Sequence, residues 1–176
     1  MLIYQTQKSI VFTGFMGAGK TTIGKMIANA LGRDFIDTDE EIETKYKLPA
    51  SDIFKLFGEQ TFREEEMKLV TSLCKEEMHV ISLGGGAFLQ EDIREVCMKN
   101  CIVIYLDIPW EQWKERIPLI LDTRPVLQGK SETEMKELFY NRKSIYSQHH
   151  FKINTGNQNP EGIAKSILEY LNSDKI

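Results

Sequence analysis

The chain has 176 residues, with 41% hydrophobic and 27% charged residues, which is typical of one ordinary globular domain with a substantial core. Its net charge of −4 excludes a global basic field for nucleic acid or an anionic membrane. We therefore expect no nucleic-acid or membrane partner, and any anionic ligand has to be met by local donors.

Short apolar runs predict strands at residues 9–12, 34–37, 80–83, 102–106 and 151–154. Helical spacing of apolar residues predicts helices at 20–31, 39–46, 51–57, 59–78, 91–98, 109–117, 131–147 and 160–171. Gly32 is expected to cap the first helix, Pro109 to lie in the first helical turn of "PWEQWKERI", and "SETE" at 131–134 to form a capping box.

Strands that alternate with helices, most of them apolar throughout, predict an α/β fold with a parallel sheet covered on both faces. No repeat or linker divides the chain, so we expect a single domain over residues 1–176. The least regular piece, residues 118–130, suits a mobile lid between two helices.

The cysteines, Cys74, Cys97 and Cys101, are odd in number and form no C-x-x-C pair. Without a cysteine framework, a reducing compartment is favoured. The histidines share no metal-ligand spacing with them, and no signal-like N-terminus or 18-residue apolar run occurs. We expect a cytoplasmic protein without a zinc site.

A phosphate-binding motif is present at residues 14–21, where "GFMGAGKT" matches G-x-x-x-x-G-K-[ST] between a predicted strand and a predicted helix. Glycines let the backbone wrap a phosphate with its N–H groups, and the helix N-terminus adds a favourable dipole. Lys20 can reach the β- and γ-phosphates, and the Thr21 hydroxyl can ligate Mg²⁺. The structural alternative is a simple glycine-rich turn, which does not require a strand before it and a helix after it. The predicted ATP site comprises Gly14, Gly17, Ala18, Gly19, Lys20, Thr21 and Thr22.

A P-loop alone predicts nucleotide binding and does not define a reaction. Three further stretches are candidates for binding the molecule that accepts the phosphate. "EQTFREEE" places Arg63 among acids on a helix, "ISLGGGAF" places Gly84–Gly86 after a strand, and "DTRPVL" places Arg124 in the irregular segment. Each has a structural alternative: Arg63 could pair with Glu59 or Glu66 on a solvated face, the glycines could form only a turn, and Arg124 could be a surface arginine. Ligands in parallel sheets bind at the carboxyl ends of strands, which favours a binding role for the glycines.

In this order, the motifs resemble those of the shikimate kinases over nearly the whole chain, from "GFMGAGKTT" through "FIDTDEEIE", "FREEE" and "LGGGAF" to "TRPVL" and "RKSIY". The resemblance implies a three-layer α/β/α P-loop fold with a five-stranded parallel sheet in the order 2-3-1-4-5 and a lid at about 116–130. It implies a kinase that transfers the γ-phosphoryl of ATP to the 3-hydroxyl of shikimate, with Mg²⁺, in chorismate and aromatic amino-acid synthesis. A monomer is expected.

The resemblance also implies roles on the acceptor side. Arg63 and Arg142 take the carboxylate of shikimate, which a guanidinium binds bidentately. Asp39 accepts from ring hydroxyls and orients or deprotonates the attacking one, and the Gly84–Gly86 turn closes over the ring.

On the phosphate side, Asp37 is implied as a water-mediated Mg²⁺ partner, with Thr21 as direct ligand. Lys20 and Arg124 act on the transferring phosphoryl group, and Arg124 closes the site against water. Within the expected lid, Arg116 is the only arginine ahead of the Arg-Pro pair, with apolar residues 117–121 after it, and Asn154 stands where the family often has aspartate.

The remaining acids of the "FIDTDEEIE" stretch have a structural interpretation. Glu41 and Glu43 precede Lys45 and Lys47 by four residues, the favourable orientation on a helix, and Glu40 is solvated in the first turn.

Two other classes of function are possible for such a chain. A gluconate kinase of the same fold would share the P-loop but would not need the other motifs together. A regulatory nucleotide-binding module without catalysis would be favoured by the loss of Lys20, Asp39 or Arg124, and all three are present.

Overall fold

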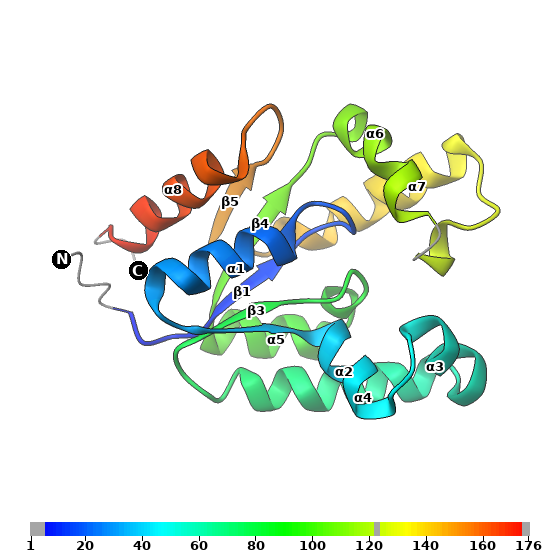
Figure 1. The fold of residues 1–176 in the computed structure, drawn as a ribbon, viewed down its shortest axis with the longest axis horizontal. Helices are drawn as coiled ribbons and strands as arrows, with labels where there is room; N and C mark the ends of the chain where they lie inside the picture. The colour runs from blue at the N-terminus through cyan, green and yellow to red at the C-terminus, as the bar shows by residue number, and fades with distance from the viewer. Residues whose placement is uncertain (1–5, 122–123, 174–176) are drawn as a thin grey trace.

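A computed structural model of the chain describes residues 6–121 and 124–173. Its strands form one parallel sheet in the order β2-β3-β1-β4-β5 (Figure 1), with Ile10 of β1 opposite Val80 of β3 and Ile102 of β4. The strands are β1 Ile10–Thr13, β2 Asp34–Asp37, β3 His79–Ser82, β4 Ile102–Asp107 and β5 Phe151–Asn154. The predicted sheet, its strand order and the α/β class are confirmed.

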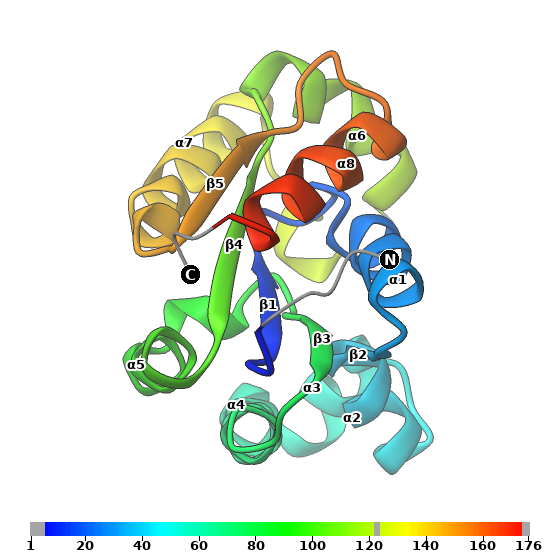
Figure 2. The ribbon, with the colours of Figure 1, turned by 90° about the vertical axis from the view of Figure 1, so that its left-hand side faces the viewer.

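The helices complete a three-layer arrangement: α1 and α8 cover one face of the sheet, and α4, α5 and α7 lie on the other (Figure 2). The α-helices are α1 Lys20–Leu31, α2 Thr38–Tyr46, α3 Ala50–Phe57, α4 Glu59–Leu73, α5 Glu91–Asn100, α6 Trp110–Ile120, α7 Glu132–Lys143 and α8 Pro160–Leu171. Short 3₁₀ turns are η1 Ala87–Leu89, η2 Pro125–Leu127 and η3 Ile145–Ser147. Within the described ranges, no helix is both long and apolar enough to cross a bilayer.

The core has two parts. The main cluster surrounds β1 and β4, which are buried along their whole length, as expected for central strands of a parallel sheet. A second cluster of Ile42, Ile53 and Phe62 joins α2, α3 and α4 beside the sheet. The segment that follows β2 therefore has a small core of its own.

Helix α4 is shorter than its sequence predicts, because it ends at Leu73 and not at 78. Lysine and glutamate at 75–77 have good helix propensity, which extended the prediction. The chain instead turns at Met78, with φ 69°, so that His79 can pair with Asp34 and begin β3. Tertiary pairing here overrides local propensity.

Helix α6 is longer than predicted. It runs through Pro118 to Ile120, so the first part of the predicted irregular segment is helical, and Pro109 is its N-cap residue and does not lie in its first turn. Helix α7 begins with the predicted capping box of Ser131 and Glu134 but ends at Lys143, where η3 follows. Asp122 and Thr123 of the predicted lid lie outside the described residues.

Candidate active site

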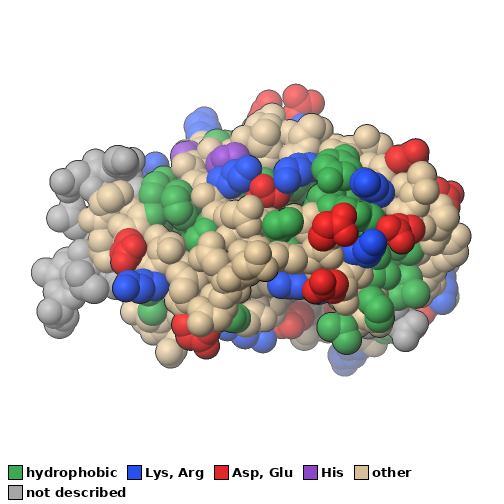
Figure 3. All heavy atoms as spheres, turned by 90° about the horizontal axis from the view of Figure 1, so that it is seen from above, with side chains coloured by type: hydrophobic (Ala, Val, Ile, Leu, Met, Phe, Trp, Pro, Cys, Tyr) green, Lys and Arg blue, Asp and Glu red, His purple; other side chains and the backbone are tan. Residues whose placement is uncertain are grey.

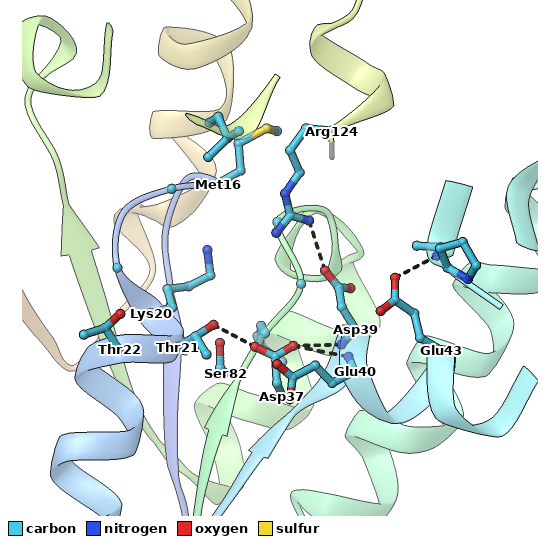
Figure 4. A pocket seen from close by; sticks show the side chains of 18 of the residues that line it. Met16, Lys20, Thr21, Thr22, Asp37, Asp39, Glu40, Glu43, Ser82 and Arg124 are labelled. Atoms are coloured by element: carbon cyan, nitrogen blue, oxygen red, sulfur yellow. Dashed lines mark hydrogen bonds and ion pairs between the residues drawn. The ribbon is translucent and has the colours of Figure 1, made fainter. Parts of the chain in front are cut away.

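A cavity of about 740 Å³ lies beyond the carboxyl ends of β1, β2 and β3, where a parallel sheet presents its ligand site (Figure 4). Its walls come from the P-loop, from Asp37 and Asp39 after β2, from Leu83 to Gly85 after β3, and from α6 and the residues beyond it. The P-loop, Asp37, Asp39 and Arg124 thus share one space with the first two glycines of the predicted acceptor turn, whereas Arg63, Gly86 and Arg142 are not among the residues that line this cavity.

The P-loop follows β1 and ends where α1 begins. Gly14 has φ 143°, and a Cβ there would lie only 2.6 Å from the carbonyl oxygen of Leu106 on β4. Glycine is therefore required for the chain to leave the sheet at this point. Gly17 and Gly19 also have positive φ, and Gly19 is the N-cap of α1.

Lys20 is held over the centre of this loop. Its Nζ donates to the carbonyl oxygens of Gly14 at 2.8 Å and Phe15 at 3.1 Å, and the side chain is buried. Burial, helped by the positive charge of Arg124, lowers its pKa to about 8, while Asp39 and Asp37 act in the opposite direction. The ammonium is thus a desolvated cation at neutral pH, suited to a phosphate ligand.

Helix α6 supports the P-loop from its other side. Trp113 Nε1 donates to Met16 O at 2.7 Å, and Arg116 Nη1 donates to Gly17 O at 2.6 Å. These bonds hold two carbonyls of the loop in place. Sequence reasoning missed Trp113, whose only signal was its apolar helical spacing, and assigned no role to Arg116.

Asp37 and Thr21 lie side by side in the cavity. Thr21 Oγ1 donates to Asp37 Oδ2 at 2.8 Å, while Asp37 Oδ1 accepts from the backbone N–H of Asp39 at 3.1 Å and of Glu40 at 3.4 Å. Asp37 is thus the N-cap of α2, which fixes its carboxylate beside the hydroxyl of α1.

Asp39 and Arg124 meet although they are 85 residues apart in sequence. Arg124 Nη1 lies 3.3 Å from Asp39 Oδ2, with the guanidinium pointing across the cavity toward α2 (Figure 4). Asp39 occupies the first turn of α2, where negative charge is favoured. A carboxylate and a guanidinium implied by separate motifs therefore face each other near Lys20.

The acid pairs predicted for the rest of this stretch are partly replaced. Glu43 Oε1 accepts from the backbone N–H of Ala50 at 2.7 Å, and Glu40 and Glu43 both line the cavity. Lys45 forms its ion pair with Glu65 of α4 instead of with Glu41. Glu43 thus binds α2 to α3, and Glu65 binds α4 to α2. Spacing within a single helix, on which the predicted pairs rested, cannot reveal such contacts between helices.

The Gly84–Gly86 turn packs tightly against two acceptor-side residues. A Cβ at Gly84 would lie 2.2 Å from Asp39 Oδ1, and one at Gly86 would lie 2.5 Å from Arg63 Nη2. The N–H of Gly84 also donates to Thr38 Oγ1 at 2.9 Å. Glycine is favoured at positions 84 and 86 because side chains of α2 and α4 occupy the space, whereas a Cβ at Gly85 would make only an ordinary contact with Met16, at 3.5 Å.

Arg142 approaches the same turn from α7. Its Nη1 donates to Gly85 O at 3.3 Å, its guanidinium lies 5.8 Å from the centre of the Phe15 ring, and the Tyr146 hydroxyl donates to the same carbonyl at 3.1 Å. Burial lowers the pKa of Arg142. The turn therefore brings Asp39, Arg63 and Arg142 into one neighbourhood.

Arg63 forms ion pairs with both Glu59 and Glu66, the two acids that the structural interpretation of its sequence motif suggested as partners. Its Nη1 lies 2.7 Å from Glu66 Oε2 and its Nη2 lies 3.3 Å from Glu59 Oε1. The arginine side chain is only 26% exposed and lies near the rings of Phe54 and Phe62, so it does not belong to a solvated face.

Glu66 is a buried acid that sequence reasoning did not place in the site. Its Oε2 accepts from Arg63 and, at 2.8 Å, from Gln90 Nε2, while its buried Oε1 has no hydrogen-bond partner among the described residues. Burial raises its pKa to about 7, and Asp39 adds to the rise, whereas Arg63 and Gln90 oppose it. Its i+3 spacing from Arg63 was the only signal in the sequence.

The fold and this site define a class. A P-loop with its lysine, an adjoining Thr–Asp pair, a second half-site with Asp39 and two arginines, and Arg124 between the halves form a P-loop kinase for a small molecule.

Comparison with known proteins gives the family. The family described as shikimate kinase matches residues 16–172. The shikimate kinase of Oceanobacillus iheyensis is 52% identical over 165 residues, covering 94% of this chain and 90% of that protein. The shikimate kinase of Bacillus subtilis is 45% identical, covering 94% and 89%.

Solved structures agree. A shikimate kinase from Acinetobacter baumannii, in complex with shikimate, has a TM-score of 0.90 and 35% identity, and the match covers 98% of this chain and 97% of that one. A gluconokinase from Sinorhizobium meliloti, at 16% identity and a TM-score of 0.52, shares the fold alone. The chain belongs to the shikimate kinase family of ATP-dependent enzymes.

Proposed function

We propose that this chain transfers the γ-phosphoryl of ATP to the 3-hydroxyl of shikimate, with ATP on the P-loop and shikimate between α2, α4 and the Gly84–Gly86 turn. One observation carries the proposal: Asp39 lies 3.3 Å from Arg124 in the same cavity as Lys20. An acceptor oxygen bound to Asp39 is thereby next to the cations that meet a γ-phosphate. The shikimate complex of the A. baumannii relative supports the choice of acceptor.

On the acceptor side, Arg63 and Arg142 bind the carboxylate of shikimate. Both guanidiniums lie at the glycine turn and are partly buried, where charge-assisted bonds to a carboxylate are strong. Asp39 accepts from the attacking hydroxyl and orients it, and it can receive the hydroxyl proton as the phosphoryl group is transferred.

On the phosphate side, Lys20 and Arg124 stabilise the charge that spreads over the transferring group. Lys20 exchanges its two loop carbonyls for phosphate oxygens. Arg124 exchanges Asp39 for the phosphoryl group, and this exchange frees Asp39 for the acceptor hydroxyl. Residues 116–130 form the lid that excludes water during transfer.

The residues present fit Mg²⁺. Thr21 Oγ1 and Asp37 offer a hydroxyl and a carboxylate 2.8 Å apart, and within the described ranges no group of three or more acids, histidines or cysteines forms a protein cage for a metal. Mg²⁺ prefers such sparse sites, because it keeps waters and takes phosphate oxygens. Bound there, it would neutralise charge on the phosphates, with Thr21 as ligand and Asp37 acting through water.

The enzyme acts as one domain over residues 1–176 and as a monomer in the cytoplasm, without a nucleic-acid or membrane partner. The free cysteines Cys74, Cys97 and Cys101 suit a reducing compartment. Acidic and basic side chains are interspersed on the face shown in Figure 3, which forms no single-sign stripe for nucleic acid.

A coupled assay of ADP release tests the proposal. With ATP and Mg²⁺, shikimate is expected to stimulate release strongly, and gluconate or a nucleoside monophosphate is not. Product analysis by NMR is expected to place the phosphate on O3. Stimulation by gluconate without stimulation by shikimate would refute the assignment.

A further inference from the structure

Outside the cavity, the buried carboxylate of Asp107 at the end of β4 is the centre of a charge cluster whose two lysines reach it from the surface. Asp107 is 4% exposed, and its Oδ1 accepts from Lys143 Nζ and from the Tyr105 hydroxyl, each at 2.9 Å. Its Oδ2 lies 2.9 Å from Lys152 Nζ. One buried acid thus holds two lysines and a phenol.

This cluster is internally balanced. Burial alone would raise the pKa of Asp107, but the hydrogen bonds from Lys143, Lys152 and Tyr105 outweigh it and hold the pKa below its ordinary value. The acid therefore stays ionised at neutral pH and attracts both lysines at short range. A buried acid with its charge met in this way can anchor the segments that supply its partners.

The two lysines come from different elements. Lys143 is the last residue of α7 and follows Arg142 directly, whereas Lys152 lies on β5, to which the site described above assigns no ligand. Tyr105 adds a second link, because its ring stacks on Tyr146 at 5.5 Å and the Tyr146 hydroxyl binds Gly85 O. The cluster therefore reaches the acceptor side through α7 and η3 and not through β5.

The end of a helix needs such an anchor. The last turn of any helix leaves carbonyls without intrahelical partners and frays readily. Arg142 lies in that turn, and its long side chain has to hold a fixed position at the glycine turn. Misplacement of a ligand-binding group by about 1 Å can cost a large factor in rate or affinity.

We propose that Asp107 is a positioning residue for shikimate binding: through Lys143 it fixes the last turn of α7 and so aims Arg142 at the acceptor carboxylate. The proposal rests on the proposed function of Arg142. Asp107 itself touches no substrate, and its effect is on acceptor affinity and not on the chemical step.

Two matched variants test the proposal. Lys143→Met removes the link between Asp107 and α7, and Lys152→Met removes an equal charge and an equal bond on the β5 side. We expect Lys143→Met to raise the KM for shikimate about tenfold, with kcat and the KM for ATP changed less than about twofold. Lys152→Met is expected to leave all three within about twofold, and Lys143→Arg to restore the KM for shikimate.

A double-mutant cycle shows whether the effect passes through Arg142. In an Arg142→Ala background, Lys143→Met is expected to add nothing further to the KM for shikimate. Equal effects of the two lysine variants, or additive effects of Lys143→Met and Arg142→Ala, would overturn the proposal. If Lys143→Met lowers the melting temperature appreciably, Lys143→Gln is measured against the same criteria. Failure of the wild-type enzyme to phosphorylate shikimate would instead refute the proposed function, so the two failures are distinguishable.

Discussion

The two halves of the site are built in different ways. The loop of the phosphate half is one continuous segment, residues 14–21, whose backbone is shaped by glycine and rests on the main core through buried Phe15 and Met16. The acceptor half takes Asp39 from α2, Arg63 from α4 and Arg142 from α7. The phosphate loop therefore takes its ligand groups from adjacent residues, although α6 supports it, and the acceptor half exists only when distant elements pack together.

The supports of the two halves differ as well. Asp39 and Arg63 of the acceptor half lie on helices joined by the small cluster of Ile42, Ile53 and Phe62, beside the buried acid Glu66, whereas Arg142 lies over Phe15 of the main core. In the proposed function, backbone N–H groups meet phosphate on one side, whereas paired side chains meet the acceptor on the other. Changes in distant packing should accordingly alter acceptor affinity before they alter nucleotide binding.

The largest effect is expected for Asp39→Asn, which keeps the shape of the acceptor half and removes its base. We expect kcat to fall about 10³-fold, because positioned proton transfer contributes on that scale, while ATP affinity stays nearly constant. Steady-state kinetics and titration with a non-hydrolysable ATP analogue measure the two. Glu41→Gln, two residues away on the same helix, is the control and should change kcat less than about twofold. A similar loss of kcat in Asp39→Asn and Glu41→Gln would show that Asp39 has no special role in the acceptor half.

Arg124→Ala tests the residue that joins the halves. We expect kcat to fall about 10²-fold and the KM for shikimate to change much less, since the charge matters most in the transition state. Single-turnover measurements separate the chemical step from product release. An unchanged kcat would remove Arg124 from the mechanism.

A comparison of two glycines is expected to give the next largest effects. In Gly86→Ala the added Cβ would lie 2.5 Å from Arg63 Nη2, so the methyl group displaces the guanidinium. The KM for shikimate should therefore rise about tenfold at nearly unchanged stability. In Gly14→Ala the methyl group meets the backbone of Leu106 at a φ of 143°, so the melting temperature should fall by about 5 °C or more. Calorimetry and kinetics on both variants check this contrast. A Gly86→Ala enzyme that loses stability at normal KM would show that the turn is structural.

The smallest effect concerns Glu66. Its pKa of about 7 in the folded chain lies above the ordinary value of 4.5, so the folded state favours the proton. The stability that this acid contributes is fully present below about pH 4.5 and is lost as pH rises through 7. The melting temperature of Glu66→Gln, relative to wild type, should therefore increase by about 5 °C between pH 5 and pH 8.

The neighbouring acid provides the control for that measurement. Glu65 pairs with Lys45 and Lys68 at the surface, and those bonds lower its pKa. The stability that Glu65 contributes is lost only as pH falls below the ordinary pKa of a glutamate. The melting temperature of Glu65→Gln, relative to wild type, should therefore not change between pH 5 and pH 8. If the melting temperature of Glu66→Gln, relative to wild type, is also independent of pH, then folding does not raise the pKa of Glu66.

Several features were predictable from sequence because their causes are local. The P-loop needs glycines at fixed offsets before a lysine, the capping box at Ser131 needs only four residues, and α8 begins and ends where Pro160 and Leu171 indicate. The end of α4 was predicted wrongly, since pairing of His79 with Asp34 and not helix propensity determines it. The role of Glu66 was missed because burial gives this glutamate its shifted pKa, and no neighbour in sequence reveals burial.

The sequence by itself determined the family, the parallel sheet and the phosphate loop, because apolar runs, glycine offsets and motif order are properties of the chain. Only the tertiary structure decided which acids are solvated and which are buried, and which donors hold the P-loop and the last turn of α7. Trp113 supports a loop almost a hundred residues away, and Asp107 holds Lys143 and Lys152 from two other elements. Such contacts depend on distances between elements, which packing sets and sequence spacing does not record.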